Sequence, residues 1–454
     1  MISKIYSDDS EEYLFPGLEV MQQPSIADAI LPPVYSRRVL IFSDDNSITQ
    51  DNGRKEAVQI LRDALQTTVE QFPVLANGLS RSSGAWRFLP GQARLFVKQL
   101  PLSFQELKSA NFSSTLLDPD TLSSVPEMTD SEKDWDCCRI QANFIKGGLL
   151  LCVSIHHLAM DGANITEVIQ DLARNTFVKA QPQVKRGPAA FDRSRLSISS
   201  SVPDISKMPA YMVVSESFDF STRTAGSIAS MMYRFTNQSL ARLKSDSALF
   251  LPPDCPWIST HDAVCALVFR QKIKARFAAG ILKSNDLVQY SFPVEYRNII
   301  NPPLPSDYVG NAVIFTATSF ITVDDLLAPE GLSLAGAAVR RAIRCVDADY
   351  IDNSIAVMRD IPASRSLMYY GALYGKTTGI TSTTYKSFTM PDTWHSAIGK
   401  YELMRLTHGA FGDGMFVIMP VREAGWEVIV TLDETAMEAF EDDEWKKYAV
   451  KSDV

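Results

Sequence analysis

Two adjacent histidines, His156 and His157, end an apolar stretch of the sequence, and Asp161 and Gly162 follow after three intervening residues. A histidine can exchange its proton near neutral pH, so His157 could act as a general base toward a hydroxyl or an amine that attacks a carbonyl carbon. Asp161 could orient the imidazole ring, or it could hold the loop by pairing with an arginine. Gly162 would give the turn conformational freedom. The pattern therefore predicts a base on a loop.

A structural interpretation of the same residues stays open at this point. A histidine at the end of a buried strand can pack its ring and satisfy both nitrogens locally. Asp161 could equally cap a helix that begins just after it. The residues alone leave the catalytic and the structural interpretations nearly balanced.

The segments on either side predict a strand, a turn and a helix. Residues 147–155 form a continuous apolar run of the length expected for a strand buried on both faces. Residues 163–177 have helical periodicity, and Asn164 with Glu167 three residues later predicts a capping box. The histidines therefore lie on a strand–loop–helix corner, a place where loops carry side chains into clefts.

The rest of the chain alternates predicted strands and helices in two halves. Residues 35–42 predict a strand, and residues 54–72 predict an amphipathic helix. Residues 181–215 lose this periodicity and are rich in Pro, Ser, Arg and Lys, which is typical of a linker. We therefore expect an N-terminal domain over 1–180 and a C-terminal domain over 216–454.

Composition narrows the class of partner. The chain has 454 residues, a net charge of −9 and 46% hydrophobic residues, so nucleic acid or an anionic membrane surface is not expected as the main partner. It has no run of ~18 apolar residues, no secretory start and no disulfide framework among its six cysteines. We expect a cytoplasmic monomer that needs no nucleic acid and no membrane.

Three other patterns predict nothing further. The glycine-rich segment 371–379 would need a glycine at Tyr370 to form a phosphate-binding loop. The paired carboxylates at 43–46 and 347–350 lack a second acidic cluster, so no metal site is expected. No G-x-S-x-G pattern is present, which argues against a serine hydrolase of that type.

The histidine segment carries a family resemblance. Residues 156–162, HHLAMDG, fit H-H-x-x-x-D-G, which BAHD acyltransferases share with the condensation domains of nonribosomal peptide synthetases. The chain resembles a BAHD acyltransferase along most of its length, and its divergence resembles the fungal branch that includes trichothecene acetyltransferases. Four further segments carry this resemblance in the family's order: FPVLANGL (72–79), STHDAVCALVFR (259–270), FPVEYRNIINPPLPSDYVGNAV (292–313) and GMFVIMPVREAGWEVIVTLDETAMEAFEDDEW (414–445).

The resemblance implies a fold and a reaction. The fold would be α/β, with two chloramphenicol-acetyltransferase-like domains of mixed sheets flanked by helices, joined by a crossover linker and with a solvent channel along their interface. His157, midway along it, would deprotonate the acceptor, which attacks the thioester of an acyl-CoA. Because a thiol of pKa ~8.5 leaves readily, no strong general acid is needed. Acyl-CoA would be a co-substrate, with no permanently bound cofactor, and the acceptor would be a small secondary metabolite.

The resemblance also implies roles for individual residues. Asp161 would be structural and would pair with Arg297, whereas His156 would be a packing neighbour. The oxyanion would be stabilised by a donor in the 381–385 segment, of which Thr384 is the candidate, or by a nearby backbone amide. Contacts to the acyl-CoA are expected from Ser382, Thr384, Gly399 and Lys400.

One departure from the family keeps alternatives open. The second family signature, D-F-G-W-G, is absent, and at its expected place, 395–402, only Gly399 and Lys400 survive. The segment GAFGDG at 409–414 lies too close to the following predicted strand to replace it. The alternatives are a free-standing condensation-type domain and a BAHD scaffold reused for another reaction.

Overall fold

In the computed structural model, the chain folds into two compact units. The first unit comprises Met1–Ser197, Pro305–Ala312 and Phe388–Ala410, and the second comprises Ile198–Leu304, Val313–Ser387 and Phe411–Val454. This division differs from the expected contiguous domains, since two later segments fold with the first unit. The structure describes residues 4–7, 10–17, 23–29, 31–44, 48, 50–82, 85–130, 132–177, 186–215, 227–361, 365–369, 378–409 and 412–452.

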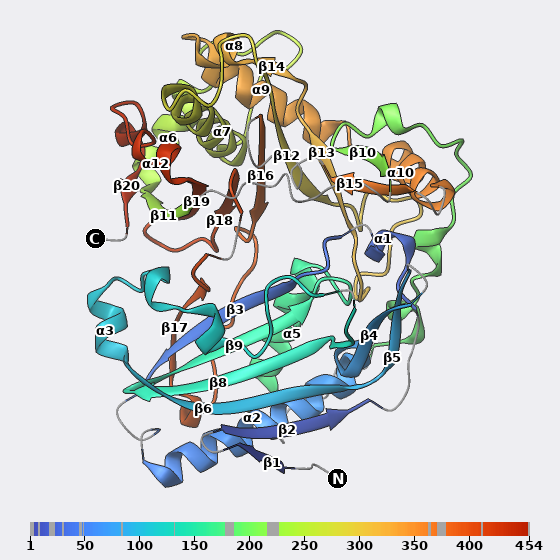
Figure 1. Cartoon of the computed structure of the whole chain (residues 1–454), viewed down its shortest axis with the longest axis vertical. Coiled ribbons are helices and arrows are strands. Elements are labelled where there is room, and N and C mark those ends of the chain that lie inside the picture. The colour runs from blue at the N-terminus through green and yellow to red at the C-terminus, as the bar shows by residue number, and fades with distance from the viewer. Residues whose placement is uncertain are drawn as a thin grey trace. The chain divides into compact units, whose positions relative to one another are not determined.

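A seven-stranded sheet forms the centre of the first unit (Figure 1). All neighbouring strands are antiparallel except β6 and β8, which are parallel. Every residue of the apolar strand β9 is buried, so the prediction of a buried strand before the histidines is confirmed. In sheet order the strands are β1 (Lys4–Ser7), β2 (Ser10–Pro16), β6 (Gln92–Ser103), β8 (Cys138–Lys146), β9 (Gly148–His156), β3 (Tyr35–Ser43) and β17 (Lys400–Leu406).

The two faces of this sheet are covered differently. Helices α2 (Asp51–Gln71) and α5 (Gly162–Asn175) pack together and lie behind the sheet in the view of Figure 1. On the other face, leucines of the segment that contains α3 (Phe104–Ser109) and α4 (Pro119–Leu122) join a core with alternate residues of β3 and β9. The predicted amphipathic helix over 54–72 is confirmed as most of α2.

The first unit also contains a short helix and a small sheet, and the segment after this sheet is hydrogen-bonded to the end of β9. The helix α1 (Ile26–Ala29) is short and partly buried. A three-stranded sheet in the order β5 (Ala85–Pro90), β4 (Asn77–Ser82) and β7 (Trp135–Asp136) lies in the same unit. The N–H of His156 donates to the carbonyl of Cys137, directly after β7, which ties this small sheet to the histidines.

The second unit contains a larger mixed sheet and most of the remaining helices. Its strands follow the order β13 (Val313–Ala317), β12 (Leu287–Glu295), β16 (Gly379–Thr384), β18 (Met415–Ile418), β19 (Trp426–Asp433), β11 (Ile228–Phe235) and β20 (Val450–Lys451), with β14 (Ile321–Thr322) beside β12. β16 is parallel to both β12 and β18, and the other pairs are antiparallel. A separate pair joins β10 (Tyr211–Ser215) and β15 (Arg365–Tyr369).

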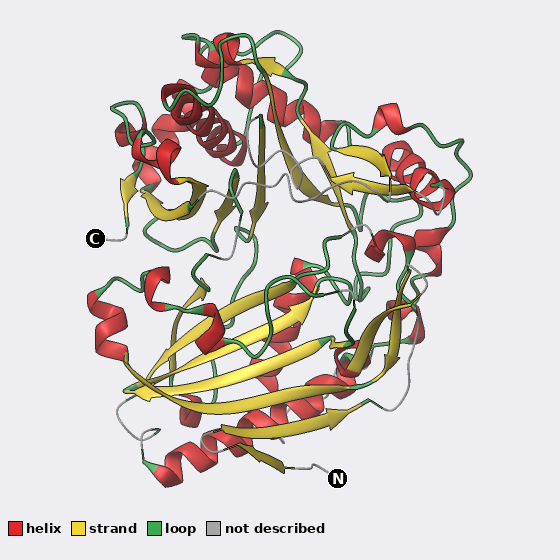
Figure 2. Ribbon diagram, in the orientation of Figure 1, coloured by secondary structure: helices red, strands yellow, loops and turns green. Residues whose placement is uncertain are grey.

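A nearly fully buried helix, α7 (Thr260–Ala278), forms the core of this unit and packs against α6 (Asn237–Asp246) and α9 (Gly331–Arg344). The other helices of the unit are α8 (Val323–Leu327), α10 (Ala348–Asp360) and α12 (Glu434–Glu438). Both units therefore combine mixed sheets with helices (Figure 2), which confirms the predicted fold class. Among the described residues, no helix is both long and apolar enough to cross a membrane.

Candidate active site

The turn between β9 and α5 carries the histidine motif. β9 ends at His156 and α5 begins at Gly162, with Asp161 as its N-cap. Oδ1 of Asp161 accepts hydrogen bonds from the N–H groups of Ala163 at 3.1 Å and Asn164 at 3.2 Å, which satisfies donors that a helix start leaves open. The strand–loop–helix prediction is confirmed.

The predicted capping box at Asn164 is wrong, because Asn164 already lies inside the first turn of α5. Its Oδ1 accepts from the N–H of Gly310 at 2.9 Å, and its Nδ2 donates to the carbonyl of Tyr308 at 3.0 Å. The side chain therefore binds the main chain of the segment 308–312, which the sequence separates from it by more than a hundred residues.

His156 is a buried packing residue. Its Nδ1 accepts from the N–H of Leu158 at 3.2 Å, so the ring proton lies on Nε2, which is 3.1 Å from Oγ1 of Thr129. The ring packs edge-on against Tyr35, with 5.0 Å between centroids. Burial, together with the neighbouring His157, lowers the pKa of His156 to about 3. Both nitrogens are engaged and the ring is neutral, which leaves His156 no role as a base.

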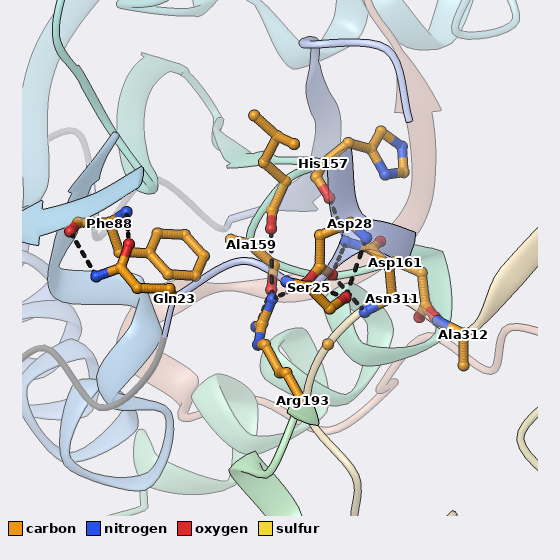
Figure 3. A network of polar contacts seen from close by, with 12 residues as sticks. Gln23, Ser25, Asp28, Phe88, His157, Ala159, Asp161, Arg193, Asn311 and Ala312 are labelled. Atoms are coloured by element: carbon orange, nitrogen blue, oxygen red, sulfur yellow. Dashed lines mark hydrogen bonds and ion pairs between the residues drawn. The ribbon is translucent and has the colours of Figure 1, made fainter. Parts of the chain in front are cut away.

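The main chain of His157 is hydrogen-bonded on both sides. Its N–H donates to the carbonyl of Val34 at 2.8 Å, and its carbonyl accepts from Nδ2 of Asn311 at 2.7 Å. Within the described part of the chain, the buried Nδ1 makes no hydrogen bond. Figure 3 shows the imidazole pointing away from the polar network that holds its main chain.

Burial keeps the ring of His157 neutral. It lowers the pKa of His157 to about 4, and the Arg38 cation acts in the same direction. The carboxylate of Asp161 and the main chain of Met160 favour the protonated ring but do not outweigh burial. The residue as a whole is only half-buried, whereas Nδ1 itself is shielded from solvent. A neutral imidazole of this kind can accept a proton at neutral pH.

Asp161 anchors main-chain groups on both of its oxygens. Beside the cap made by Oδ1, Oδ2 accepts from the N–H of Ala312 at 2.9 Å. The N–H of Asp161 lies 3.5 Å from the carbonyl of Gly310. The predicted partner Arg297 belongs to the second unit, where its Nη1 lies 3.3 Å from Glu295. Its pairing with Asp161 stays a prediction.

Gly162 lies close to neighbouring side chains. It is not among the glycines of the described chain that have a positive φ, so its backbone conformation does not itself require a glycine. A Cβ placed here would meet the ring of Phe388 at 3.0 Å and Nη2 of Arg38 at 3.3 Å. That Nη2 donates to the carbonyl of Gly162 at 2.8 Å, and Nη1 donates to Oγ1 of Thr166 at 2.7 Å.

A buried ion pair beneath the turn was not predicted. Nη1 of Arg193 lies 2.9 Å from Oδ2 of Asp28, and Nη2 donates to the carbonyl of Ala159 at 2.5 Å. Asn311 donates to Oδ1 of the same aspartate from its N–H at 3.1 Å and from Nδ2 at 2.7 Å. Figure 3 shows these side chains converging from α1, from the 186–197 segment and from 308–312. No local pattern signals this network, because its members are far apart in sequence.

The residues predicted to contact acyl-CoA fall into two groups. Ser382 and Thr384 lie on β16 of the second unit. The hydroxyl of Ser382 is 2.6 Å from the hydroxyl of Tyr290, and Oγ1 of Thr384 accepts from the N–H of Lys386 at 3.3 Å. Both hydroxyls therefore have a partner inside the unit.

Gly399 and Lys400 belong to the first unit, at the start of β17. Gly399 has φ +97°, and a Cβ would come within 2.6 Å of the carbonyl of Ser43, so glycine is required by the backbone. The side chain of Lys400 is 81% exposed, with Nζ 3.9 Å from Glu402. An acyl-CoA role for these four residues stays a prediction.

The structure describes parts of the two other glycine-containing segments, 371–379 and 409–414. Of the 409–414 segment, the described Asp413 forms a buried ion pair with Arg276 at 2.9 Å. Most of the glycine-rich segment 371–379 lies outside the described residues. Among the described residues, no group of three His, Cys, Asp or Glu side chains could hold a metal ion.

This fold and this motif define a family, and the chain belongs to it: residues 11–446 match the Transferase family, the family of the BAHD acyltransferases. The chain is 31% identical over 444 residues to the enoyl-CoA isomerase/hydratase claC of Penicillium crustosum, covering 92% of this chain and 49% of that protein. It is thus about half as long as this relative. The acetyltransferase FGR3 of Gibberella zeae is 23% identical, covering 88% of this chain and 85% of the relative.

Solved structures support the same fold. TRI101 of F. graminearum, in complex with coenzyme A and deoxynivalenol, superimposes with a TM-score of 0.83 at 17% identity, covering 95% of this chain and 99% of TRI101. Vinorine synthase superimposes with a TM-score of 0.67 at 11% identity, covering both chains fully. The predicted membership of the BAHD family and the two-domain fold are confirmed.

Proposed function

We propose that this chain transfers an acyl group, most often acetyl, from acyl-CoA to a hydroxyl or amine of a small secondary metabolite, with His157 as the general base. The observation that carries the proposal is a neutral ring on a fixed backbone. Burial lowers the pKa of His157 to about 4, and both main-chain groups of the residue are hydrogen-bonded. Relatives named as acyltransferases and the complex of TRI101 with coenzyme A support this choice of reaction.

The proposed reaction needs one proton carrier. The neutral ring of His157 takes the proton of the acceptor as its oxygen or nitrogen attacks the thioester carbonyl. The tetrahedral intermediate collapses, the C–S bond breaks, and the imidazolium returns the proton to the departing CoA thiolate. Thr384 would donate a hydrogen bond to the oxyanion. Asp161 would hold the turn and, through the proposed pairing, Arg297.

The residues proposed to contact acyl-CoA differ in whether their polar groups already have a hydrogen-bonding partner. The exposed ammonium of Lys400 is available to a phosphate group, since its nearest described carboxylate is 3.9 Å away. The hydroxyl of Ser382 would have to share its hydrogen bond with Tyr290. Acyl-CoA would act as a co-substrate of a monomer, with no permanently bound cofactor.

The test is an activity screen with matched variants. Purified protein would be incubated with acetyl-CoA and other acyl-CoAs against a panel of alcohols and amines, and the products would be identified by mass spectrometry. His157→Ala should abolish the new product, whereas His408→Ala, which removes an exposed histidine, should keep it. A product formed at the wild-type rate by folded His157→Ala would overturn the role of His157 as the base.

A second candidate reaction follows from one relative. Because claC is named an enoyl-CoA isomerase/hydratase, the same imidazole could instead remove a proton from carbon next to the thioester carbonyl. Acyl-CoAs and enoyl-CoAs incubated in D₂O without an acceptor would then gain deuterium in the presence of the wild type but not of His157→Ala. Acyl transfer without such exchange would favour the first proposal.

A further inference from the structure

The turn that carries His157 is held through its carbonyl groups. Nδ2 of Asn311 donates to the carbonyl of His157 at 2.7 Å. Nη2 of Arg193 donates to the carbonyl of Ala159 at 2.5 Å, and Nη1 lies 3.5 Å from the carbonyl of Leu158. Rotation of any of these peptide groups would leave a buried donor without its acceptor, which is costly. Two side chains thus fix the backbone that sets the direction of the His157 ring.

One carboxylate holds both of these side chains. Asp28 is completely buried and accepts from Asn311 on Oδ1, while Oδ2 faces Arg193 at 2.9 Å. The N–H and hydroxyl of Ser25 also donate to Oδ2, at 2.6 and 2.7 Å. A buried charge pair of this kind is rigid because every displacement loses charge-assisted hydrogen bonds. Asp28 therefore fixes the positions of the Asn311 and Arg193 side chains relative to each other.

We propose that Asp28, Arg193 and Asn311 act as a unit of positioning residues that aims the imidazole of His157. None of the three is placed at the reacting atoms, and each acts through the main chain of the turn. Their contribution differs from that of Asp161, which caps α5 and binds Ala312 at the other end of the same turn. The inference rests on the proposed role of His157 as the base. Misplacement of a reacting group by about 1 Å can cost about 10²-fold in rate.

The first unit contains a matched control for this network. Asp171 and Arg186 form a second buried ion pair, with side chains 3% exposed and 3.4 Å between Oδ2 and Nη1. Arg186 lies over the ring of Phe72, as Arg193 lies over the ring of Phe88. Asp171 is in the middle of α5, away from the turn. Asp171→Asn should therefore weaken a buried ion-pair cluster, in which Asp171 also binds Arg174 and Arg186 also binds Glu167, without releasing the carbonyls of the turn.

The kinetic experiment compares Asn311→Ala, Asp28→Asn and Arg193→Lys with Asp171→Asn in the full chain. With acetyl-CoA as donor, and water as acceptor if no better one is found, the three network variants should lower kcat by about 10- to 100-fold. KM for acetyl-CoA should stay within about two-fold, because the network is not expected to touch this substrate. Asp171→Asn should lower the Tm by a similar amount and leave kcat within about two-fold of wild type.

The energetic coupling between Asp28 and Asn311 gives a second test of the proposal. Because Asp28 acts through both Asn311 and Arg193, Asn311→Ala should add little to Asp28→Asn, and the double variant Asp28→Asn/Asn311→Ala should lose little more activity than the worse single variant. Arg193→Lys keeps the charge beside Asp28 and serves as the mild variant if Asp28→Asn does not fold. Wild-type kcat in folded Asn311→Ala and Arg193→Lys would overturn the proposal.

An activity-independent measurement separates this inference from the proposed function. Histidine-selective ¹⁵N NMR of the full chain would follow the ring signals of His157, identified by their loss in His157→Ala. In Asn311→Ala these signals should move and their titration should shift, whereas in Asp171→Asn they should match wild type. If wild type turns over no acyl-CoA, the proposed function fails and these spectra decide. Unchanged His157 signals in Asn311→Ala would then overturn the positioning role.

Discussion

The N–H of Ala312 donates to Oδ2 of Asp161 at 2.9 Å across 151 residues of sequence, while Oδ1 of the same carboxylate caps α5. Both oxygens of Asp161 therefore serve main-chain donors. His157, four residues earlier, has its own main chain fixed and its Nδ1 without a hydrogen bond among the described residues. The anchor of the turn and the base on it are thus separate side chains, and substitutions should separate their effects.

Asp161→Asn should lose stability as well as rate. The amide would present its NH₂ to one of the N–H donors that the carboxylate now accepts, so we expect a loss of about 2 kcal/mol in the free energy of unfolding. His157→Ala should remain as stable as wild type and lose only kcat. Denaturant titration of both variants with parallel rate measurements checks this. Asp161→Asn with wild-type stability would contradict the assignment of Asp161 as the anchor.

The pH dependence of the rate should report the buried environment of His157. Burial and Arg38 lower the pKa of this ring from 6.5 to about 4, against the opposing effect of Asp161. Because the neutral ring is the base, activity should persist as the pH falls through 6.5 and should be lost only toward about 4. The measurement is kcat against pH, with fluorescence confirming a folded chain at each point. Half-loss of kcat near pH 6.5 would show that the ring titrates as if exposed.

Gly162→Ala should destabilise the first unit by steric overlap. Its Cβ would lie 3.0 Å from the ring of Phe388 and 3.3 Å from Arg38, so we expect a cost of about 1–3 kcal/mol. Adding Phe388→Leu should recover part of the loss by making room. Gly187→Ala is the control, because nothing lies within 4 Å of a Cβ there. Equal Tm values for Gly162→Ala and Gly187→Ala would refute the packing argument.

The ion pair between Arg276 and Asp413 should stabilise the second unit. Their side chains are 0% and 2% exposed, and Nη1 of Arg276 also donates to the carbonyl of Gly379 at 3.2 Å. Asp413→Asn leaves a buried guanidinium with a neutral partner, so we expect a loss of about 3–5 kcal/mol. Asp254→Asn removes an exposed partner of Arg341 and should leave the thermal stability nearly unchanged. Similar thermal denaturation of the two variants would contradict this difference.

Features of the fold that neighbouring residues determine could be predicted from the sequence, whereas features that depend on distant segments could not. The apolar run of β9 and the helical period of α5 are local patterns, and both elements formed where they were expected. The choice between Asp161 and Asn164 as the cap was ambiguous locally, since both residue types cap helices. It was decided by Tyr308 and Gly310, which bind Asn164 from a distant segment.

The network around Asp28 lay beyond any local pattern. Asp28 and Asn311 are 283 residues apart, and Arg193 falls in a stretch whose composition is typical of a linker. The packing around Gly162 could not be predicted from the local sequence either. Its requirement for a small residue comes from Phe388 and Arg38, which the spacing of the motif does not reveal.

The return of Pro305–Ala312 and Phe388–Ala410 to the first unit has a consequence for synthesis on the ribosome. β17, which forms the sheet edge beside β3, is translated only after most of the second unit. Until β17 is translated, β3 presents an unpaired edge, and until residue 312 is translated, Asp161 lacks the N–H of Ala312. The nascent first half therefore carries a strand edge open to aggregation until residues 400–406 have been translated. A chain released at the 186–197 segment would keep His156 and His157 but could not complete the sheet that supports them.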